Sequence, residues 1–380
     1  MKKLVFTLLF LGTYALLSAQ PSAYKAQPFA DDVPLTTPSM LDADYIARVM
    51  AALPLPEAAP ENIKQLSKVA SVQNHYKEFT IAWQKLESKK LSRLRKWRDS
   101  EITDLHKKQT NLFYPFAGPD FLNAYLLFPT CDNYLLFGLE KMGTLPTMAQ
   151  LRGNYLFRLR KSLSILMKRN YFITRDMINN LNSNVKGVLP LIAVFMARTD
   201  NKILSIQKVY VQKNGKPKFV AFNDNKWHPG IKGVTIEFKN KNRDLPQRMY
   251  YFGTNFVNTA MYTKKNLVNF ITNFKNKMTF TKSASYLLHG HNFSIIRNII
   301  LNQTSASVQD DTGVPYRYFK NSWSVKLYGK YARPVRDFNY GFQTDLNRLF
   351  KTDKTVKPID FTFGYHWWTD KSSILVFRKK

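Results

Sequence analysis

Two adjacent carboxylates, Asp310 and Asp311, precede Thr312 and Gly313 and are the residues of this chain best suited to acid–base chemistry. Two carboxylates that share one proton can activate water, and paired Asp-Thr-Gly triplets do this in aspartic proteases. This chain has one such triplet and no Asp-Ser-Gly, so a homodimer would have to supply the second. Asp-Asp-Thr-Gly is also ordinary turn chemistry, in which glycine takes a positive φ. We therefore do not expect a protease from this motif.

The only close histidine pair is His289-Gly290-His291. On a strand both rings would share a face and could hold one metal ion, whereas on a helix they would diverge. The flanking residues have helical spacing, with Gly290 at a break, and no third ligand is evident. The sequence therefore predicts an interhelix loop and no metal site.

The single cysteine, Cys131, excludes a disulfide framework and a zinc site of several thiolates. No histidine lies within twenty residues of it, so we expect a buried structural cysteine and not a nucleophile. Gly-rich phosphate loops, Gly-x-Ser-x-Gly, His-Glu-x-x-His and Cys-x-x-Cys do not occur. The sequence predicts no cofactor.

The 380-residue chain carries 57 Lys and Arg against 26 Asp and Glu, a net charge of +31, and its 44% hydrophobic content excludes a disordered polycation. Residues 113–380 hold 41 of the basic and 15 of the acidic residues, so the charge belongs to the folded body. A field of this kind attracts polyanions, although a lysine-rich solvated sheet face has the same composition. The candidate polyanion-binding residues are Lys208, Lys213, Lys216, Lys218, Lys239 and Lys241.

The N-terminus has the three parts of a secretory signal peptide, residues 1–20. Lys2 and Lys3 precede an apolar stretch of about 14 residues, shorter than the roughly 20 that span a bilayer. Cleavage is expected after Ala19 or Gln20, which would place a soluble protein in the periplasm or outside the cell. The nearest polyanions there would be lipopolysaccharide, anionic glycans and extracellular DNA.

The remaining sequence predicts a poorly ordered Pro- and Ala-rich leader over 21–60, with one short helix at 41–53, and a single α+β domain over 61–380. Amphipathic helices are expected within 61–112, and a mainly antiparallel sheet with inserted helices within the basic body, 113–380. The expected helices cover 119–128, 149–182, 263–277 and 281–303. The expected strands cover 134–139, 188–198, 203–212, 217–222, 233–239, 249–256, 314–319, 323–331, 359–368 and 371–378.

Three longer strings are more specific than these motifs: Phe113-Tyr-Pro-Phe-Ala-Gly-Pro-Asp120, Lys282-Ser-Ala-Ser-Tyr-Leu-Leu-His289 and Gln309-Asp-Asp-Thr-Gly-Val-Pro-Tyr-Arg-Tyr-Phe319. From about residue 65 to the C-terminus the chain resembles an uncharacterised family of exported bacterial proteins. The resemblance implies export and a single-domain body, and it implies no activity or catalytic residue.

Two functional hypotheses follow. The first is non-enzymatic binding or scaffolding of an anionic envelope component through the basic sheet face. The second is a periplasmic hydrolase of an envelope polymer, with Asp120, Asp310, Asp311, His289 and His291 lining its cleft. The oligomeric state is not predicted.

Overall fold

The computed structural model describes residues 42–108, 110–169, 185–319, 321–366 and 368–380, all within one compact unit, Thr36–Lys380. The predicted signal peptide and residues 21–41 of the predicted leader lie outside the described residues. The rest of that leader is folded, because α1 (Ala43–Met50) packs against α10 (Leu189–Arg198) and β3 (Asn201–Val211). Four of its apolar side chains are fully buried, so a poorly ordered leader is the wrong description of residues 42–60.

A ten-stranded mixed sheet crosses the molecule in the order β4-β3-β5-β6-β2-β1-β7-β8-β10-β9. Helices pack on both of its faces, which confirms the α+β class. Five of the nine pairings between described strands are antiparallel and flank a central group of five parallel strands. The remaining strands are β1 (Asn111–Tyr114), β2 (Asn133–Gly138), β4 (Pro217–Ala221), β5 (Ile231–Asn240), β6 (Gln247–Gly253), β7 (Lys277–Thr281), β8 (Ala306–Gln309), β9 (Trp323–Gly329) and β10 (Ser373–Lys379).

The central strands stand in the order β6-β2-β1-β7-β8. From β1 the chain moves to β2 and then β6 on one side, and it returns to add β7 and β8 on the other side. The order therefore reverses between β1 and β7, and in such sheets ligands bind in the crevice beyond the carboxyl ends of the strands at that point. The loops that leave β1, β7 and β8 contain the three strings singled out in the sequence.

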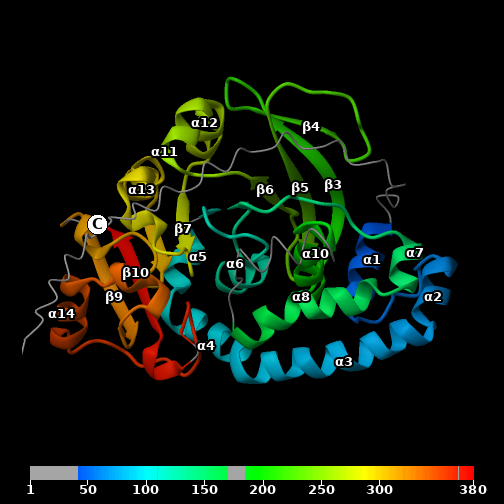
Figure 1. Ribbon diagram of the computed structural model, residues 1–380, viewed down its shortest axis with the longest axis horizontal. Coiled ribbons are helices and arrows are strands. Elements are labelled where there is room, and N and C mark those ends of the chain that lie inside the picture. Colours follow the sequence, from blue (N-terminus) through cyan, green and yellow to red (C-terminus); the bar gives the residue numbers. More distant parts are fainter. Residues whose placement is uncertain (1–41, 109, 170–184, 320, 367) are drawn as a thin grey trace, which may run out of the picture. The chain divides into compact units, whose positions relative to one another are not determined.

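Each sheet face has its own hydrophobic core. Core A includes Leu112, Leu136 and Phe238 and packs against α6 (Phe121–Leu127) and α10. Core B includes Phe113, Leu135 and Phe252 and packs against α12 (Lys265–Asn273) and α13 (Ser294–Gln303). Figure 1 shows α12, α13 and α11 (Asn258–Thr263) above the sheet. It shows α3 (Ala70–Leu86), α4 (Ser92–Glu101) and α8 (Tyr155–Arg169) below the sheet. The helices of the first and second halves of the parallel group thus lie on opposite faces.

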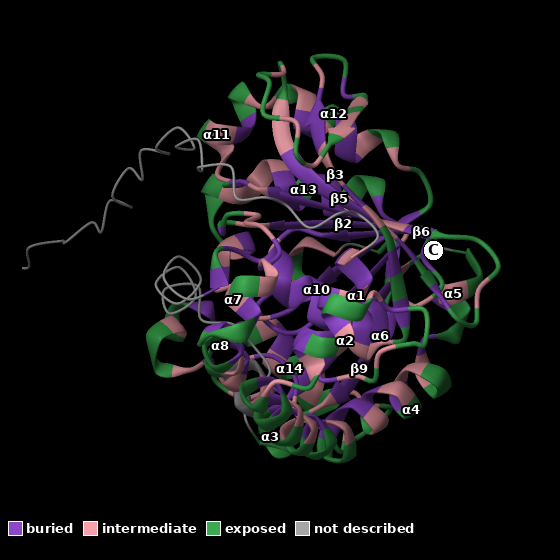
Figure 2. Ribbon diagram, turned by 90° about the vertical axis from the view of Figure 1, so that its right-hand side faces the viewer, coloured by how far each residue is buried: buried purple, intermediate pink, exposed green. Residues whose placement is uncertain are grey.

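The N-terminal helices lie on the side of core A. They are α2 (Glu61–Ser67), α3 (Ala70–Leu86), a π-helical turn (Glu87–Leu91), α4 (Ser92–Glu101) and α5 (Thr103–Lys108). Figure 2 shows that α3 exposes its outer side, whereas α10 is almost entirely buried. The other helices are α7 (Met148–Arg152), α8 (Tyr155–Arg169) and α14 (Thr344–Thr352). Among the described residues, the helices are too short or too polar to span a membrane.

Several predicted elements are wrong. Residues 189–198 form a helix and not a strand, and Pro190 fits its first turn. The apolar side chains of this helix are buried on all sides, so the sequence shows no helical periodicity there. Residues 314–319 contain a 3-10 turn, and residues 359–366 and 368 form irregular chain, with residue 367 outside the described residues. Irregular chain and two 3-10 turns replace the first part of the helix predicted over 281–303, and the unpredicted strand β7 lies where the predicted helices 263–277 and 281–303 adjoin. Strands β1 and β8, of four residues each, were not predicted.

Candidate active site at the carboxyl edge of the parallel strands

Asp120 anchors the loop that follows β1. It caps α6, as its position predicts, because its Oδ1 accepts hydrogen bonds from the backbone N–H of Asn123 at 3.2 Å and from Asn123 Nδ2 at 2.8 Å. Its Oδ2 accepts a hydrogen bond from the Tyr114 hydroxyl at 3.1 Å and forms an ion pair with Lys282 Nζ at 2.7 Å. Asp120 and Lys282 are both almost completely buried, so this pair joins the loops after β1 and β7 inside the protein.

Lys90 adds a second buried amine beside this ion pair. It lies in the π-helical turn between α3 and α4, and its side chain exposes only 6% of its surface. Its Nζ has no hydrogen-bond partner in the described part of the protein. Burial, together with the nearby charge of Lys282, holds the pKa of Lys90 well below its ordinary value, although Asp120 opposes this shift. Burial at this position therefore disfavours the charged form of the Lys90 amine.

The loop after β7 has an unusual backbone. Ser283, Ser285 and Tyr286 have φ values of 53°, 51° and 54°, the left-handed region that L-residues rarely adopt. Neighbouring side chains hold the loop: the N–H of Ser283 donates to Asp310 Oδ2 at 2.9 Å, and the N–H of Ser285 donates to the Tyr365 hydroxyl at 3.1 Å. A residue in this region costs conformational free energy, so it persists only where the surrounding structure holds it. Residues of this kind cluster at functional sites.

Asp310 and Asp311 leave β8 directly opposite this loop. Asp310 accepts from the N–H of Ser283 and from the N–H and hydroxyl of Thr312, whereas Asp311 Oδ2 accepts from the Tyr286 hydroxyl at 2.5 Å. Burial raises the pKa of both carboxyls, and the charge of Asp310 raises that of Asp311 further. Asp310 receives more hydrogen bonds, so its ionised form is the better stabilised, whereas the pKa of Asp311 is raised to about 7.

His289 joins the carboxylate pair, but His291 does not. The His289 ring packs edge-on against Tyr286, with centroids 5.1 Å apart, and interacts with the backbone of Asp311. Burial lowers the pKa of His289 to about 4, and its buried Nε2 has no partner among the described residues. His291 is exposed in a 3-10 turn that precedes α13, so it does not join the buried carboxylates as the hydrolase hypothesis expects. In the described residues no group of His, Cys, Asp and Glu could hold a metal ion.

Four of the five predicted catalytic residues therefore meet at one edge of the sheet: Asp120, His289, Asp310 and Asp311. Sequence reasoning missed Lys90, Lys282 and Glu140, which is buried just after β2. Lys282 begins one of the three specific strings, and Lys90 occupies an otherwise apolar position of the helical pattern. Those two signals were present in the sequence.

The six predicted polyanion-binding lysines do not form one surface. Lys218 pairs with Tyr210 near the end of β3, whereas Lys239 pairs with Lys202 near its start, so about 26 Å of strand separates them. They also point to opposite faces, because Phe238 next to Lys239 lies in core A and Val209 next to Tyr210 lies in core B. Lys208 donates to the Asp224 carbonyl and Lys241 pairs with Asp200, whereas Lys213 and Lys216 are exposed near the β3–β4 turn.

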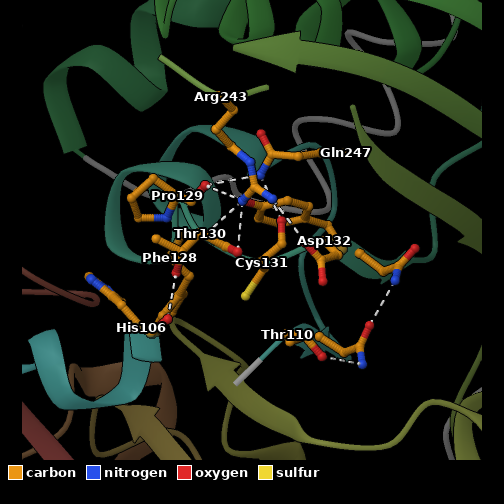
Figure 3. Close-up of polar contacts among 12 residues, drawn as sticks. His106, Thr110, Phe128, Pro129, Thr130, Cys131, Asp132, Arg243 and Gln247 are labelled. Carbon is orange, nitrogen blue, oxygen red and sulfur yellow. Dashed lines mark hydrogen bonds and ion pairs between the residues drawn. The ribbon is translucent and has the colours of Figure 1, made fainter. Parts of the chain in front are cut away.

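Cys131 lies in a tightly bonded loop (Figure 3) that precedes the amino end of β2. Arg243 donates to the Thr130 carbonyl at 2.8 Å and pairs with Asp132, and Gln247 Nε2 donates to the Cys131 carbonyl at 2.6 Å. The thiol is fully buried, and burial raises its pKa far above the ordinary value. Cys131 is a structural cysteine, as predicted, and takes no part in the candidate site.

No protein-family model, curated protein or solved structure matches this chain.

Proposed function

We propose that the protein is a hydrolase whose active site lies at the carboxyl ends of β1, β7 and β8. The observation that supports this best is the buried pair Asp310 and Asp311, held beside His289 by a strained loop. Ser283, Ser285 and His289 are only half-buried, so the pair lies close to the surface. Two buried carboxyls with different hydrogen-bond partners ionise at different pH values, and this difference lets one act as a base and the other as an acid.

In this mechanism the Asp310 carboxylate takes a proton from water while the water oxygen attacks the scissile carbon. The Asp311 carboxyl gives its proton to the leaving group, so one bond to oxygen forms, one bond to the leaving group breaks and one water is consumed. The proton then returns from Asp310 to Asp311, and Tyr286 keeps the Asp311 side chain in place. His289, neutral at physiological pH, offers its Nε2 to the substrate or the water.

The test uses Asp310→Asn and Asp311→Asn, with Asp370→Asn as the matched control on an exposed 3-10 turn. Purified protein is assayed on p-nitrophenyl esters and glycosides and on two envelope polymers, peptidoglycan and lipopolysaccharide. General acid–base catalysis predicts a loss of about 10²–10⁴ in rate for each site variant and none for the control. Absence of turnover on the whole panel, or full activity of both site variants, would overturn the proposal.

Binding of an anionic polymer is the second candidate, and the exposed β3–β4 turn with Lys213, Lys216 and the nearby Lys218 supports it. Reversal of these three charges to Glu should weaken retention on heparin- or lipopolysaccharide-coated resin, with an effect that fades at high salt. Reversal of Lys239 and Lys241, at the other end of the sheet, is the matched control. Equal retention of both variants and the wild type would exclude this surface.

Export is part of both proposals and rests on the signal-peptide pattern of residues 1–20. Expression of the full chain in a Gram-negative host should yield a periplasmic protein that begins at Gln20 or Pro21. Recovery of an uncleaved chain from the cytoplasm would contradict it.

A further inference from the structure

The first half of the parallel group carries a second set of residues that the hydrolytic mechanism does not use. Glu140 follows β2 by two residues, and its side chain lies against the loop that follows β1. A Cβ built on Gly138 would stand 2.5 Å from Glu140 Oε2, 2.9 Å from Gly118 Cα and 2.9 Å from the Tyr251 hydroxyl. The missing side chain at position 138 is what allows the Glu140 carboxylate and Gly118 to approach each other.

Glu140 is a buried acid. It exposes 5% of its surface, and in the described part of the chain no salt bridge reaches its carboxylate. The Tyr251 hydroxyl donates its single proton to the Glu140 backbone carbonyl at 2.8 Å, which leaves only a long contact of 3.5 Å to Oε2. Burial raises the pKa of this carboxyl. The backbone N–H groups of Glu140 and Leu139 also interact with this carboxylate. A carboxylate has about four acceptor positions, so hydroxyl donors on a ligand can still bind it.

The place of this acid in the fold indicates the ligand. In open α/β sheets with this order of parallel strands, a glycine-containing turn after the first strand receives a nucleotide, and an acid about 20 residues on accepts hydrogen bonds from the ribose hydroxyls. Here Gly118, with a φ of 51°, lies in the turn after β1, and Glu140 follows it by 22 residues at the end of β2. Leu139, exposed by 57%, provides apolar surface next to the acid.

We propose that the carboxyl ends of β1 and β2 bind the ribose of a nucleoside, with the Glu140 carboxylate accepting hydrogen bonds from its 2′- and 3′-hydroxyls. This ligand is independent of the hydrolytic mechanism, so each proposal can fail without the other. The nucleoside is the substrate itself or part of a cofactor, and both share the same vicinal diol.

The turn after β1 also limits what the nucleoside carries. The N–H groups of Ala117 and Gly118 both donate to the Phe137 carbonyl, at 2.7 and 3.1 Å, so they do not form a phosphate cradle. The Asp120 carboxylate occupies the N-terminus of α6, where a pyrophosphate binds in dinucleotide-binding proteins. We therefore expect a nucleoside with a neutral or cationic 5′ group, and not a dinucleotide.

The experiment measures binding by isothermal titration and by thermal shift, with activity as no part of the readout. The probes are adenosine, guanosine, cytidine and uridine, the 2′,3′-dideoxy form of whichever binds best, S-adenosylmethionine and NAD⁺. Removal of both hydroxyls should weaken binding about ten- to a hundredfold, as should Glu140→Gln, because each removes a charge-assisted hydrogen bond. Glu57→Gln, an exposed glutamate, is the matched control and should bind like the wild type.

Each outcome decides the proposal. Failure of every ribonucleoside and S-adenosylmethionine to bind the wild type overturns it, as does equal binding of the dideoxy form. The dideoxy comparison uses wild-type protein, so it stands even if Glu140→Gln does not fold. S-adenosylmethionine binding tighter than the free nucleoside identifies a cofactor, the reverse order identifies a substrate, and tightest binding of NAD⁺ contradicts the exclusion of phosphate.

Discussion

Replacement of Lys90 by Met should stabilise the protein. The amine of Lys90 is buried beside the ammonium of Lys282 and has no partner among the described residues, and a buried polar group left unsatisfied costs about 1–3 kcal/mol. Methionine has nearly the same length and no polar atom to desolvate. We therefore expect the free energy of unfolding of Lys90→Met to exceed that of the wild type by about 1–3 kcal/mol at pH 7.

The gain should depend on pH with a sign that the structure determines. Burial lowers the pKa of Lys90 in the folded protein, whereas in the unfolded chain it returns to 10.5. Between these two values the unfolded state binds one more proton than the folded state, so the wild type becomes more stable as the pH rises. The advantage of Lys90→Met should therefore shrink by up to about 1.4 kcal/mol per pH unit as the pH rises, and it should stop changing above pH 10.5, where the amine is neutral in both states.

The assay is urea denaturation of both proteins at several pH values, with the m-value held as a check that the unfolded states are comparable. Lys89→Met, at an exposed position of the same π-helical turn, is the control and should change stability by about 0.5 kcal/mol or less. A Lys90→Met protein that is less stable than the wild type, or a gain that grows with pH, would refute the reasoning. A variant that is more stable but inactive would show that the amine is kept for function.

Three further predictions use the same measurements. Asp120→Asn should lose about 3–5 kcal/mol of stability because the buried Lys282 ammonium loses the charge of the Asp120 carboxylate. Asp132→Asn, which breaks a surface pair with Arg243, should lose about 1 kcal/mol or less, and equal losses would contradict the role of burial. Asp311→Asn should be more stable than the wild type at pH 7, because the raised pKa of Asp311 makes the folded state favour the protonated acid. This gain should vanish as the pH falls to 3.8, and a gain that persists in acid would contradict the prediction. Cys131 should resist Ellman's reagent in the native protein and react as one thiol in urea, and rapid native modification would show that its loop opens.

The identity of the site residues could be predicted from the sequence more easily than their proximity in the folded protein. Asp120, Asp310, Asp311 and His289 attract notice by residue type, and the capping role of Asp120 follows from its position before an apolar stretch. Their proximity depends on parallel pairing of β1, β7 and β8, which are far apart in the sequence. β1 and β8 are four residues long, too short to show a period of two.

The longer antiparallel strands were predicted better because their alternation is visible. β3, β5 and β6 expose or half-expose one side over part of their length, and Asn214-Gly215 marks the turn between β3 and β4, where Gly215 has a φ of 78°. The helix at 189–198 was predicted as a strand for the opposite reason, because a completely buried helix has no polar face to reveal its period. The prediction that six lysines form one basic sheet face is wrong, because composition does not determine which lysines lie on the same face.

The π-helical turn at 87–91 has a consequence for how this chain tolerates change in length. Its wide turn holds one residue more than an α-helical turn, and the successive residues Lys90 and Leu91 are both buried there. Deletion of one residue from this turn would restore a regular helix and rotate α4 by about 100° relative to α3. Trp97, which packs on Tyr328 and Phe361, would then leave its place. The bulge thus sets the phase between two helical segments that pack against different neighbours, and the helix cannot be shortened by one residue there without losing one of those interfaces.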